Sequence, residues 1–171
     1  MKLIKELTDK EVLGEEIEPS KEYSLRTAAR AIIFDENKQI ALLSMPQWKC
    51  HKLPGGGLEE KEDLKTTLVR EVKEELGSDI EITHELGKII EYKNKYSQKQ
   101  VSYCFFAKLK GPKGEPSFTK EEKEAGANVI WASINEAIRL FKNDSPEEYT
   151  PKFIKARDLE FLIAFKDEKE S

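Results

Sequence analysis

The spacing of hydrophobic residues changes several times along the chain, and each change marks a new element. Residues 23–45 contain two aliphatic runs on either side of a polar tetrad at 35–38, a pattern that predicts two strands joined by a turn. Residues 62–76 instead predict a helix, because aliphatic side chains recur there at every fourth position. These side chains are Leu64, Leu68, Val72 and Leu76. Gly77 follows directly and is expected to end the helix.

The second half of the chain predicts more strands and then helices. Residues 80–96 and 99–111 are rich in β-branched and aromatic residues, which is typical of strands. Residues 112–127 predict a polar loop, and 128–133 a short strand. A helix is predicted over 134–143.

Both late helices carry start signals. Ser133 and Glu136 have the spacing of a capping box at the start of the first. Thr150 is followed by Pro151, which favours the first helical position, so the last helix is predicted to run to about Phe165.

The order of the predicted elements indicates the fold class and the domain organisation. Strands come first, then a helix, more strands and finally helices, which indicates an α+β fold with mixed strands. A chain of 171 residues suits one domain. We expect residues 1–22, a strand or helix with a loose connection, to be an N-terminal extension packed on the domain. Residues 23–145 would form the main domain, and 146–171 its C-terminal helix.

Composition excludes several classes of protein. The net charge of −4 and the 36% of charged residues argue against a general binder of nucleic acid duplexes or membrane surfaces. No apolar run approaches the length of a membrane span, and the first residues lack the apolar region of a signal peptide. Cys50 and Cys104 do not suggest a disulfide framework. We therefore expect a cytoplasmic protein.

Three glutamates lie close together on the helix predicted at 62–76. At about 100° per residue, with Glu71 at zero, Glu75 lies near 40° and Glu74 near −60°. The aliphatic stripe spans about 20° to 140°, so Glu75 points into its edge and Glu71 lies at its border. Like charges at these spacings repel by about 0.2–0.5 kcal/mol per pair, and partial burial adds to that cost.

Two interpretations of this acidic face remain open at this point. It can be an ordinary solvated face that Lys65, Arg70 and Lys73 balance. It can also bind Mg²⁺ or Mn²⁺, which prefer hard oxygen ligands and usually take one or two carboxylates with waters and substrate phosphates. The Pro-Gly-Gly-Gly run at 54–57 is by itself compatible with an ordinary loop, and no Gly-Lys-Ser/Thr follows it as in a P-loop.

The spacing between the glycines and the helix favours the metal site. Gly56 is followed after five residues by Glu62, and after seven more by the run Arg-Glu-Val-Lys-Glu-Glu-Leu-Gly at 70–77. This resembles the Nudix box, G-x5-E-x7-R-E-U-x-E-E-x-G-U with U aliphatic, at every fixed position except the last, where Ser78 stands.

The resemblance to the Nudix hydrolase superfamily (MutT-like) implies a fold, a reaction and a set of site residues. The implied fold is an α/β/α sandwich around a mixed β-sheet. The implied reaction is Mg²⁺- or Mn²⁺-dependent hydrolysis of a nucleoside diphosphate linked to another moiety. The implied metal ligands are Glu71, Glu74, Glu75 and the carbonyl of Gly55. Glu62 would face Arg70 and orient the helix.

The resemblance extends over about residues 24–142. The sequence "HKLPGG" is similar to the family's aromatic-x-Leu-Pro-Gly-Gly entry, with His51 where Trp is frequent. "WASINEA" resembles the family's Trp-x-x-Leu-x-Glu-Leu passage, with Ile134 in the aliphatic place. Lys61 stands where Gly is common, which changes the turn without removing a ligand.

Roles follow from what phosphoanhydride hydrolysis needs, which is charge neutralisation and an activated water. We expect Glu74 and Glu75 to carry the metal ions, and Glu71 to act as a ligand or to accept the proton of the water. Many family members add a loop carboxylate, for which the candidates are Glu121, Glu122 and Glu124. Glu124 is favoured by its distance before Trp131, with a solvated charge run as the alternative.

The expected substrate contacts are Trp48, His51, Gly55 and Gly56. Trp48 and His51 could stack on a base, although packing is the commoner role of such residues. The first expectation for the substrate is a nucleoside triphosphate, plain or modified, cleaved between its α and β phosphates. The alternative is a catalytically weak Nudix-like module that senses or binds a nucleotide. Retention of the box glutamates favours the enzyme, and a homodimer is compatible with either.

Overall fold

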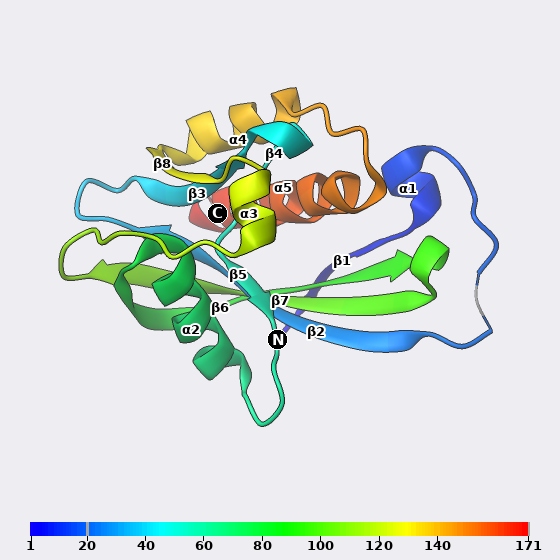
Figure 1. The fold of residues 1–171 in the computed structure, drawn as a ribbon, viewed down its shortest axis with the longest axis horizontal. Helices are drawn as coiled ribbons and strands as arrows, with labels where there is room; N and C mark the ends of the chain where they lie inside the picture. The colour runs from blue at the N-terminus through cyan, green and yellow to red at the C-terminus, as the bar shows by residue number, and fades with distance from the viewer. Residues whose placement is uncertain (20, 171) are drawn as a thin grey trace.

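Among residues 1–19 and 21–170, which the computed structural model describes, eight strands form one mixed sheet (Figure 1). The strands are β1 (Leu3–Leu7), β2 (Ser24–Phe34), β3 (Ile40–Met45), β4 (Cys50–Lys52), β5 (Gly55–Gly57), β6 (Asp79–Lys93), β7 (Gln98–Lys110) and β8 (Asn128–Ala132). The helices are α1 (Asp9–Leu13), α2 (Leu64–Leu76), α3 (Lys120–Glu124), α4 (Ile134–Asn143) and α5 (Tyr149–Glu170). Short 3₁₀ turns lie at Pro46–Trp48 and Asn94–Tyr96.

Strand β2 connects the two parts of the sheet. It runs parallel to β7 and antiparallel to β3 and β5. The strand order is β1-β6-β7-β2-β3-β4, with β5 paired to β2 and β8 paired to β3. Strand β1 is parallel to β6, and the remaining pairs are antiparallel. The register places Ala29 of β2 opposite Gly56, so the middle of β2 carries the glycine strand.

Helices cover both faces of this sheet (Figure 1). Successive residues of a strand point to opposite faces, so β2 contributes to two hydrophobic clusters. Ile33 lies in the cluster that contains Leu68 and Val72 of α2, whereas Ile32 lies in the cluster that contains Phe153 of α5. This arrangement confirms the α+β class and the α/β/α sandwich around a mixed sheet.

Helix α2 begins and ends where its flanking residues satisfy the backbone. The Asp63 side chain accepts a hydrogen bond from the Thr66 N–H at 2.7 Å, which caps the helix start. Gly77 has a φ of +61°, and a Cβ there would lie 2.1 Å from the Glu115 carbonyl oxygen. Only glycine fits both demands. The predicted helix is therefore present and ends at Leu76 as expected, but it begins at Leu64 and not at residue 62, because Asp63 is its N-cap.

Two predicted loops contain regular structure. The polar loop predicted at 112–127 includes α3, whose first turn is capped by Thr119 and Glu122. That capping box was readable in the sequence, but five helical residues carry no measurable periodicity. The glycine stretch forms strand β5 rather than an isolated turn, because it pairs with β2.

The N-terminal residues join the sheet and contact the last helix. Strand β1 pairs with β6, and α1 follows it directly. Asp9 of α1 is buried and accepts hydrogen bonds from the Tyr149 hydroxyl and from the Asn94 N–H. These contacts fix the position of α1 at the start of α5.

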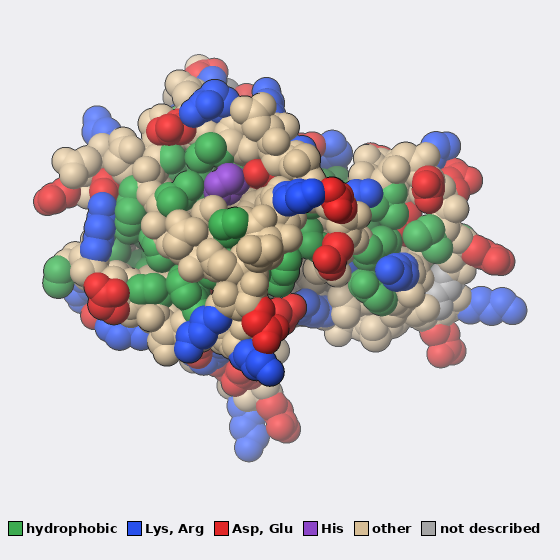
Figure 2. All heavy atoms as spheres, turned by 45° about the horizontal axis from the view of Figure 1, so that its top comes forward, with side chains coloured by type: hydrophobic (Ala, Val, Ile, Leu, Met, Phe, Trp, Pro, Cys, Tyr) green, Lys and Arg blue, Asp and Glu red, His purple; other side chains and the backbone are tan. Residues whose placement is uncertain are grey.

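The surface carries charges of both signs. On the face shown in Figure 2, acidic and basic side chains are interspersed with small hydrophobic areas. No helix within the described residues has the length and apolar character that a membrane crossing requires.

Candidate active site

Arg70 and Glu62 form a bidentate ion pair between α2 and the segment that precedes it. Arg70 Nε lies 2.7 Å from one carboxylate oxygen of Glu62, and Nη2 lies 3.0 Å from the other. The Thr67 hydroxyl donates a further hydrogen bond to Glu62 at 2.8 Å. Hydrogen bonds from Arg70 and Thr67 lower the pKa of Glu62 to about 2. The expected contact is therefore present and ties the segment before α2 to the helix, while Arg70 Nη2 also donates to the Gly57 carbonyl of the glycine strand at 3.3 Å.

Three further carboxylates converge on a single nitrogen of Arg70. Arg70 Nη1 lies 2.9 Å from Glu71, 3.6 Å from Glu74 and 3.9 Å from Glu59. Together with Glu62, four carboxylates surround one guanidinium, so the group carries excess negative charge. Additional positive charge beside these carboxylates would lower their mutual repulsion.

Glu71 lies directly over the glycine strand. A Cβ built on Gly56 would lie 2.1 Å from Glu71 Oε1, which is far inside van der Waals contact. The absence of a side chain at this position therefore allows the carboxylate to approach the backbone of β5. The φ of Gly56 is not in the left-handed region, so the requirement for glycine is steric.

Replacing Gly56 with alanine should displace the Glu71 carboxylate and lower turnover at least tenfold, with little change in stability. Gly57→Ala is the matched control, because its Cβ would meet only the flexible end of Arg26 at 3.0 Å. Steady-state kinetics and thermal melting of both variants check this. Equal activity of the two variants would contradict the role of the close approach.

Glu75 is buried and is neutralised from inside the protein. One carboxylate oxygen accepts the Gly55 N–H at 2.7 Å, and the other lies 2.7 Å from Lys52 Nζ. Lys52 Nζ also lies 3.2 Å from Glu122 of α3. Burial raises the pKa of Glu75 to about 7, because desolvation outweighs the attraction of Lys52 and of Arg30. Glu75 therefore contacts a buried lysine in addition to the glycine backbone.

Because of this pKa shift, we expect the free energy of unfolding to depend on pH. Because the folded-state pKa of Glu75 lies above its ordinary 4.5, the group stabilises the fold most below pH 4.5 and loses that contribution as pH rises through 7. Glu75→Gln cannot ionise, so its free energy of unfolding relative to the parent should rise by about 3 kcal/mol over this interval. Urea unfolding at several pH values measures the difference, and a difference that does not change with pH would contradict it.

The carbonyl of Gly55 also contacts a buried cation. Arg30 Nη1 donates a hydrogen bond to this oxygen. Gly55 has a φ of +130°, and a Cβ there would lie 2.1 Å from the Ala29 carbonyl oxygen, so no other residue fits. Desolvation, with the nearby charge of Arg157, lowers the pKa of Arg30 to about 10.

A buried polar layer lies beneath the glycine strand. Arg157 of α5 is 2.7 Å from Asp158 and 3.7 Å from Glu91 of β6. The other carboxylate oxygen of Asp158 accepts the Leu53 N–H at 2.9 Å. Burial lowers the pKa of Arg157, but the charges of Asp158 and Glu91 outweigh it and raise the pKa overall. These ions hold the segment that enters the glycine strand, and no local pattern in the sequence identified them.

The remaining expected site residues are placed differently. The Glu124 side chain is 67% exposed and lies 3.7 Å from Lys120 of the same short helix. Glu122 is the loop carboxylate that reaches the box glutamates, through Lys52. His51 Nδ1 lies 2.8 Å from Asp144, and its ring packs against Phe141. Trp48 is half-buried beside the α2 cluster. Both aromatic residues therefore pack against protein groups.

The carboxylates near Arg70 fit a hard divalent cation in chemistry and in charge. Among the described residues, no three acidic, histidine or cysteine side chains already form a metal cluster, since Arg70 Nη1 occupies the point of convergence. Glu71 and Glu74 are the side chains that would hold a cation. The other expected ligands contact cations of the protein in this structure: Arg30 contacts the Gly55 carbonyl, Lys52 contacts Glu75, and Lys120 contacts Glu124.

Comparisons with known proteins give a family and a fold. The family model described as NUDIX domain matches residues 24–153. A comparison with curated proteins finds no match. Among solved structures, a MutT protein from Methanosarcina mazei Go1 is similar, with a TM-score of 0.63 and 19% identity over 89% of this chain and 100% of that one.

Two further solved structures are similar at comparable levels. The E. coli ORF135 protein has a TM-score of 0.60 and 18% identity over 89% of this chain and 96% of that one. An ADP-ribose pyrophosphatase from Streptococcus suis 89-1591 has a TM-score of 0.53 and 24% identity over 82% of this chain and 92% of that one. These likenesses support the fold.

Proposed function

Because the chain belongs to the NUDIX domain family, whose members hydrolyse phosphoanhydride bonds with divalent metal ions, we propose that it is a Mg²⁺- or Mn²⁺-dependent nucleotide pyrophosphohydrolase. The proposed substrate is a nucleoside triphosphate, plain or modified, and the proposed cleavage lies between the α and β phosphates. The products would be a nucleoside monophosphate and pyrophosphate.

The observation that carries the proposal is the group of carboxylates around Arg70. Glu62, Glu71 and Glu74 lie within 3.6 Å of its guanidinium, and Glu71 lies against Gly56, where a side chain would not fit. A purely structural acidic face would need neither the close approach of Glu71 to Gly56 nor the excess of negative charge.

In the proposed hydrolysis, the metal ion and the box glutamates would have separate roles. A bound divalent cation would neutralise phosphate oxygens and lower the pKa of the attacking water. Glu74 would hold the cation, and Glu71, held by Arg70 beside Gly56, would be a second ligand or would accept the proton of that water.

A second function is favoured by a different observation. Lys52 and Arg30 engage Glu75 and the Gly55 carbonyl, two groups that the family resemblance assigns to the metal. If these contacts persist with nucleotide bound, the chain would be a module that senses or binds a nucleotide with little turnover.

A nucleotide panel distinguishes the two functions. Each nucleoside triphosphate, ADP-ribose and a dinucleoside polyphosphate would be incubated with Mg²⁺, Mn²⁺ or EDTA, and phosphate and pyrophosphate release measured. Release that requires the metal supports the enzyme and identifies its substrate. Tight binding in calorimetry without release across the panel supports the sensor.

A further inference from the structure

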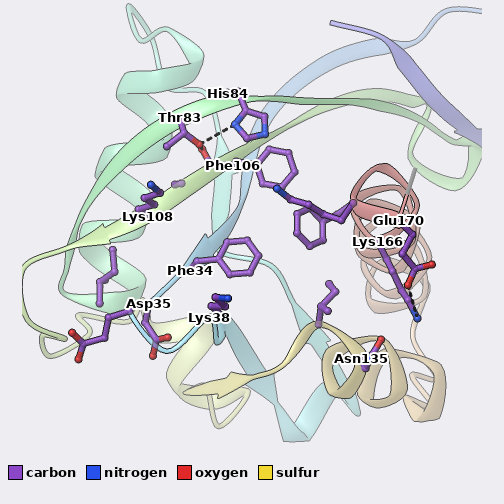
Figure 3. Close-up of a pocket in the computed structure, with 16 residues that line it drawn as sticks. Phe34, Asp35, Lys38, Thr83, His84, Phe106, Lys108, Asn135, Lys166 and Glu170 are labelled. Atoms are coloured by element: carbon purple, nitrogen blue, oxygen red, sulfur yellow. Dashed lines mark hydrogen bonds and ion pairs between the residues drawn. The ribbon is translucent and has the colours of Figure 1, made fainter.

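A large cavity lies apart from the glutamates, between the sheet and the ends of α4 and α5 (Figure 3). Its volume is about 820 Å³, within the range of roughly 300–1,000 Å³ that small-molecule pockets occupy. Its lining comes from β2, β6, β7, α4 and α5, and from the turn between β2 and β3, which contributes Asp35, Glu36 and Lys38. The proposed hydrolysis uses none of its residues.

The cavity is separate from the candidate active site. Phe34 lies five residues beyond Ala29 along β2, and Ala29 is the partner of Gly56, so the separation along the strand is roughly 16 Å. The two sites also lie on opposite faces of the sheet, because Phe34 and Phe106 pack in the α5 cluster whereas α2 packs in the other.

One wall of the cavity is a continuous series of rings. His84 and Phe106 have ring centroids 4.0 Å apart with planes tilted by 30°. Phe106 is 4.9 Å from Phe165, and Phe165 is 5.4 Å from Phe34. The outer member, His84, is exposed, so the wall presents a ring at the cavity mouth. A flat aromatic group would find an apolar surface with favourable ring contacts here.

The rim of the cavity is positively charged. The lysines are Lys38, Lys108, Lys166 and Lys169, and the acids are Asp35, Glu36 and Glu170. Asp35 is paired with Lys113 at 2.7 Å, and Glu170 with Lys166 at 3.7 Å. Within the described part of the chain, Lys38 and Lys108 make no ion pair, which leaves an excess of positive charge over Glu36.

A helix end adds to this charge. Ile134 and Asn135 line the cavity and form the first turn of the ten-residue helix α4. The N-terminal end of a helix carries partial positive charge and exposes N–H groups. The last turn of α5, with Lys166, Lys169 and Glu170, lines the cavity as well and carries the partial negative charge of a C-terminal end, so an anion is favoured on the side of α4. Figure 3 shows Lys38, Lys108 and Asn135 on different sides of the same hollow. An aromatic body against the ring wall would therefore have its anionic group near cations from two directions.

We propose that this cavity is a second binding site, for a small aromatic molecule that carries one anionic group. The ring wall takes the aromatic body, and Lys38 with Lys108 binds the anion. Because the site is formed without the box glutamates, it does not depend on the proposed hydrolysis.

Two fluorescent probes separate the apolar and the charged part of this recognition. 1-Anilinonaphthalene-8-sulfonate has an aromatic body and one sulfonate, and N-phenyl-1-naphthylamine has the same rings without the charge. Both would be titrated into the full chain. We expect saturable binding of both probes, with the sulfonate bound more tightly. Absence of saturable sulfonate binding would overturn the proposal.

Charge and shape variants assign the binding to the cavity. The double variant Lys38→Glu, Lys108→Glu should raise the dissociation constant of the sulfonate probe at least tenfold and that of the neutral probe less than threefold. The control variant Lys65→Glu, Lys123→Glu changes the net charge by the same amount at exposed lysines outside the cavity. It should bind both probes with the affinity of the parent. Thr83 is exposed and lines the cavity, so the larger side chain of Thr83→Trp should fill the space and abolish binding of both probes. Equal effects of the two lysine pairs would overturn the proposal.

Two measurements exclude binding that does not take place in the folded cavity. Thermal melting excludes probe binding by unfolded protein, and Lys108→Gln, the mildest change, should still weaken the sulfonate probe. Displacement by 1-naphthoate or by 1-naphthyl phosphate then distinguishes a carboxylate from a phosphate ligand, and displacement by neither contradicts the proposal. Loss of probe binding as dimers form in sedimentation would assign the cavity to a second copy of the chain and also contradict it.

Discussion

Replacing Glu71 with glutamine should lower the turnover number on the best nucleotide of the panel by about 10²–10⁴-fold, with no large change in stability. Glutamine keeps the shape of the side chain beside Gly56 but loses its charge and its capacity to accept a proton. The Glu71 carboxylate is 2.9 Å from Arg70 and only 16% exposed, so bulk water cannot replace it easily. Steady-state kinetics measures kcat and KM, and circular dichroism checks the fold.

Glu59→Gln is the matched control for this experiment. Glu59 approaches the same Arg70 nitrogen, at 3.9 Å, but its side chain is 69% exposed. Glu59→Gln removes one negative charge from the exposed edge of the carboxylates around Arg70, so we expect less than a threefold change in kcat. Comparable losses in the two variants would show that general electrostatics, and not the position of Glu71, governs turnover.

Arg157→Met should destabilise the fold by about 3–5 kcal/mol, the largest effect expected outside the glutamates. Arg157 is 1% exposed and lies between Glu91 and Asp158, both completely buried. Its removal leaves two carboxylates without their cation, and Asp158 also accepts the Leu53 N–H at the entrance to the glycine strand. Urea unfolding measures the loss.

Arg139→Met provides the comparison, because Arg139 is 63% exposed and pairs only with Glu136 at 3.5 Å. We expect a change within about 0.5 kcal/mol. Combining Arg157→Met with Glu91→Gln should recover part of the loss, since one of the stranded charges is removed. If Arg157→Met lowered the free energy of unfolding no more than Arg139→Met does, the ion pairs of Arg157 would not be what holds the glycine strand in place.

Much of the fold was predictable because its signals are local. Leu68 and Val72 have helical spacing and lie in the core cluster under α2, and Gly77 ends that helix because no side chain fits there. The contact of Glu62 with Arg70 also followed from spacing alone, since the helix turn fixes where Arg70 points.

The rest depended on contacts between residues that are far apart in the chain. Lys52 reaches Glu75 because it ends β4, directly before the glycine strand whose Gly55 N–H also binds Glu75. No local pattern in the sequence predicts that these two residues meet. Glu122 of the short helix α3 contacts Lys52 beside Glu75, whereas the expected Glu124 contacts Lys120. Arg157 has no distinguishing pattern within a helix of mixed polarity, and only its position against β6 makes it a buried ion.

The uptake of Mn²⁺ by the purified protein tests most directly whether the acidic group around Arg70 exists to hold a divalent cation. Titration followed by electron paramagnetic resonance, with and without a non-hydrolysable nucleotide, would compare the parent with the Glu71→Gln, Glu74→Gln double variant. The expected result is saturable binding by the parent that the double variant weakens at least tenfold. Undetectable binding by the parent, or equal binding by both proteins, would contradict the account.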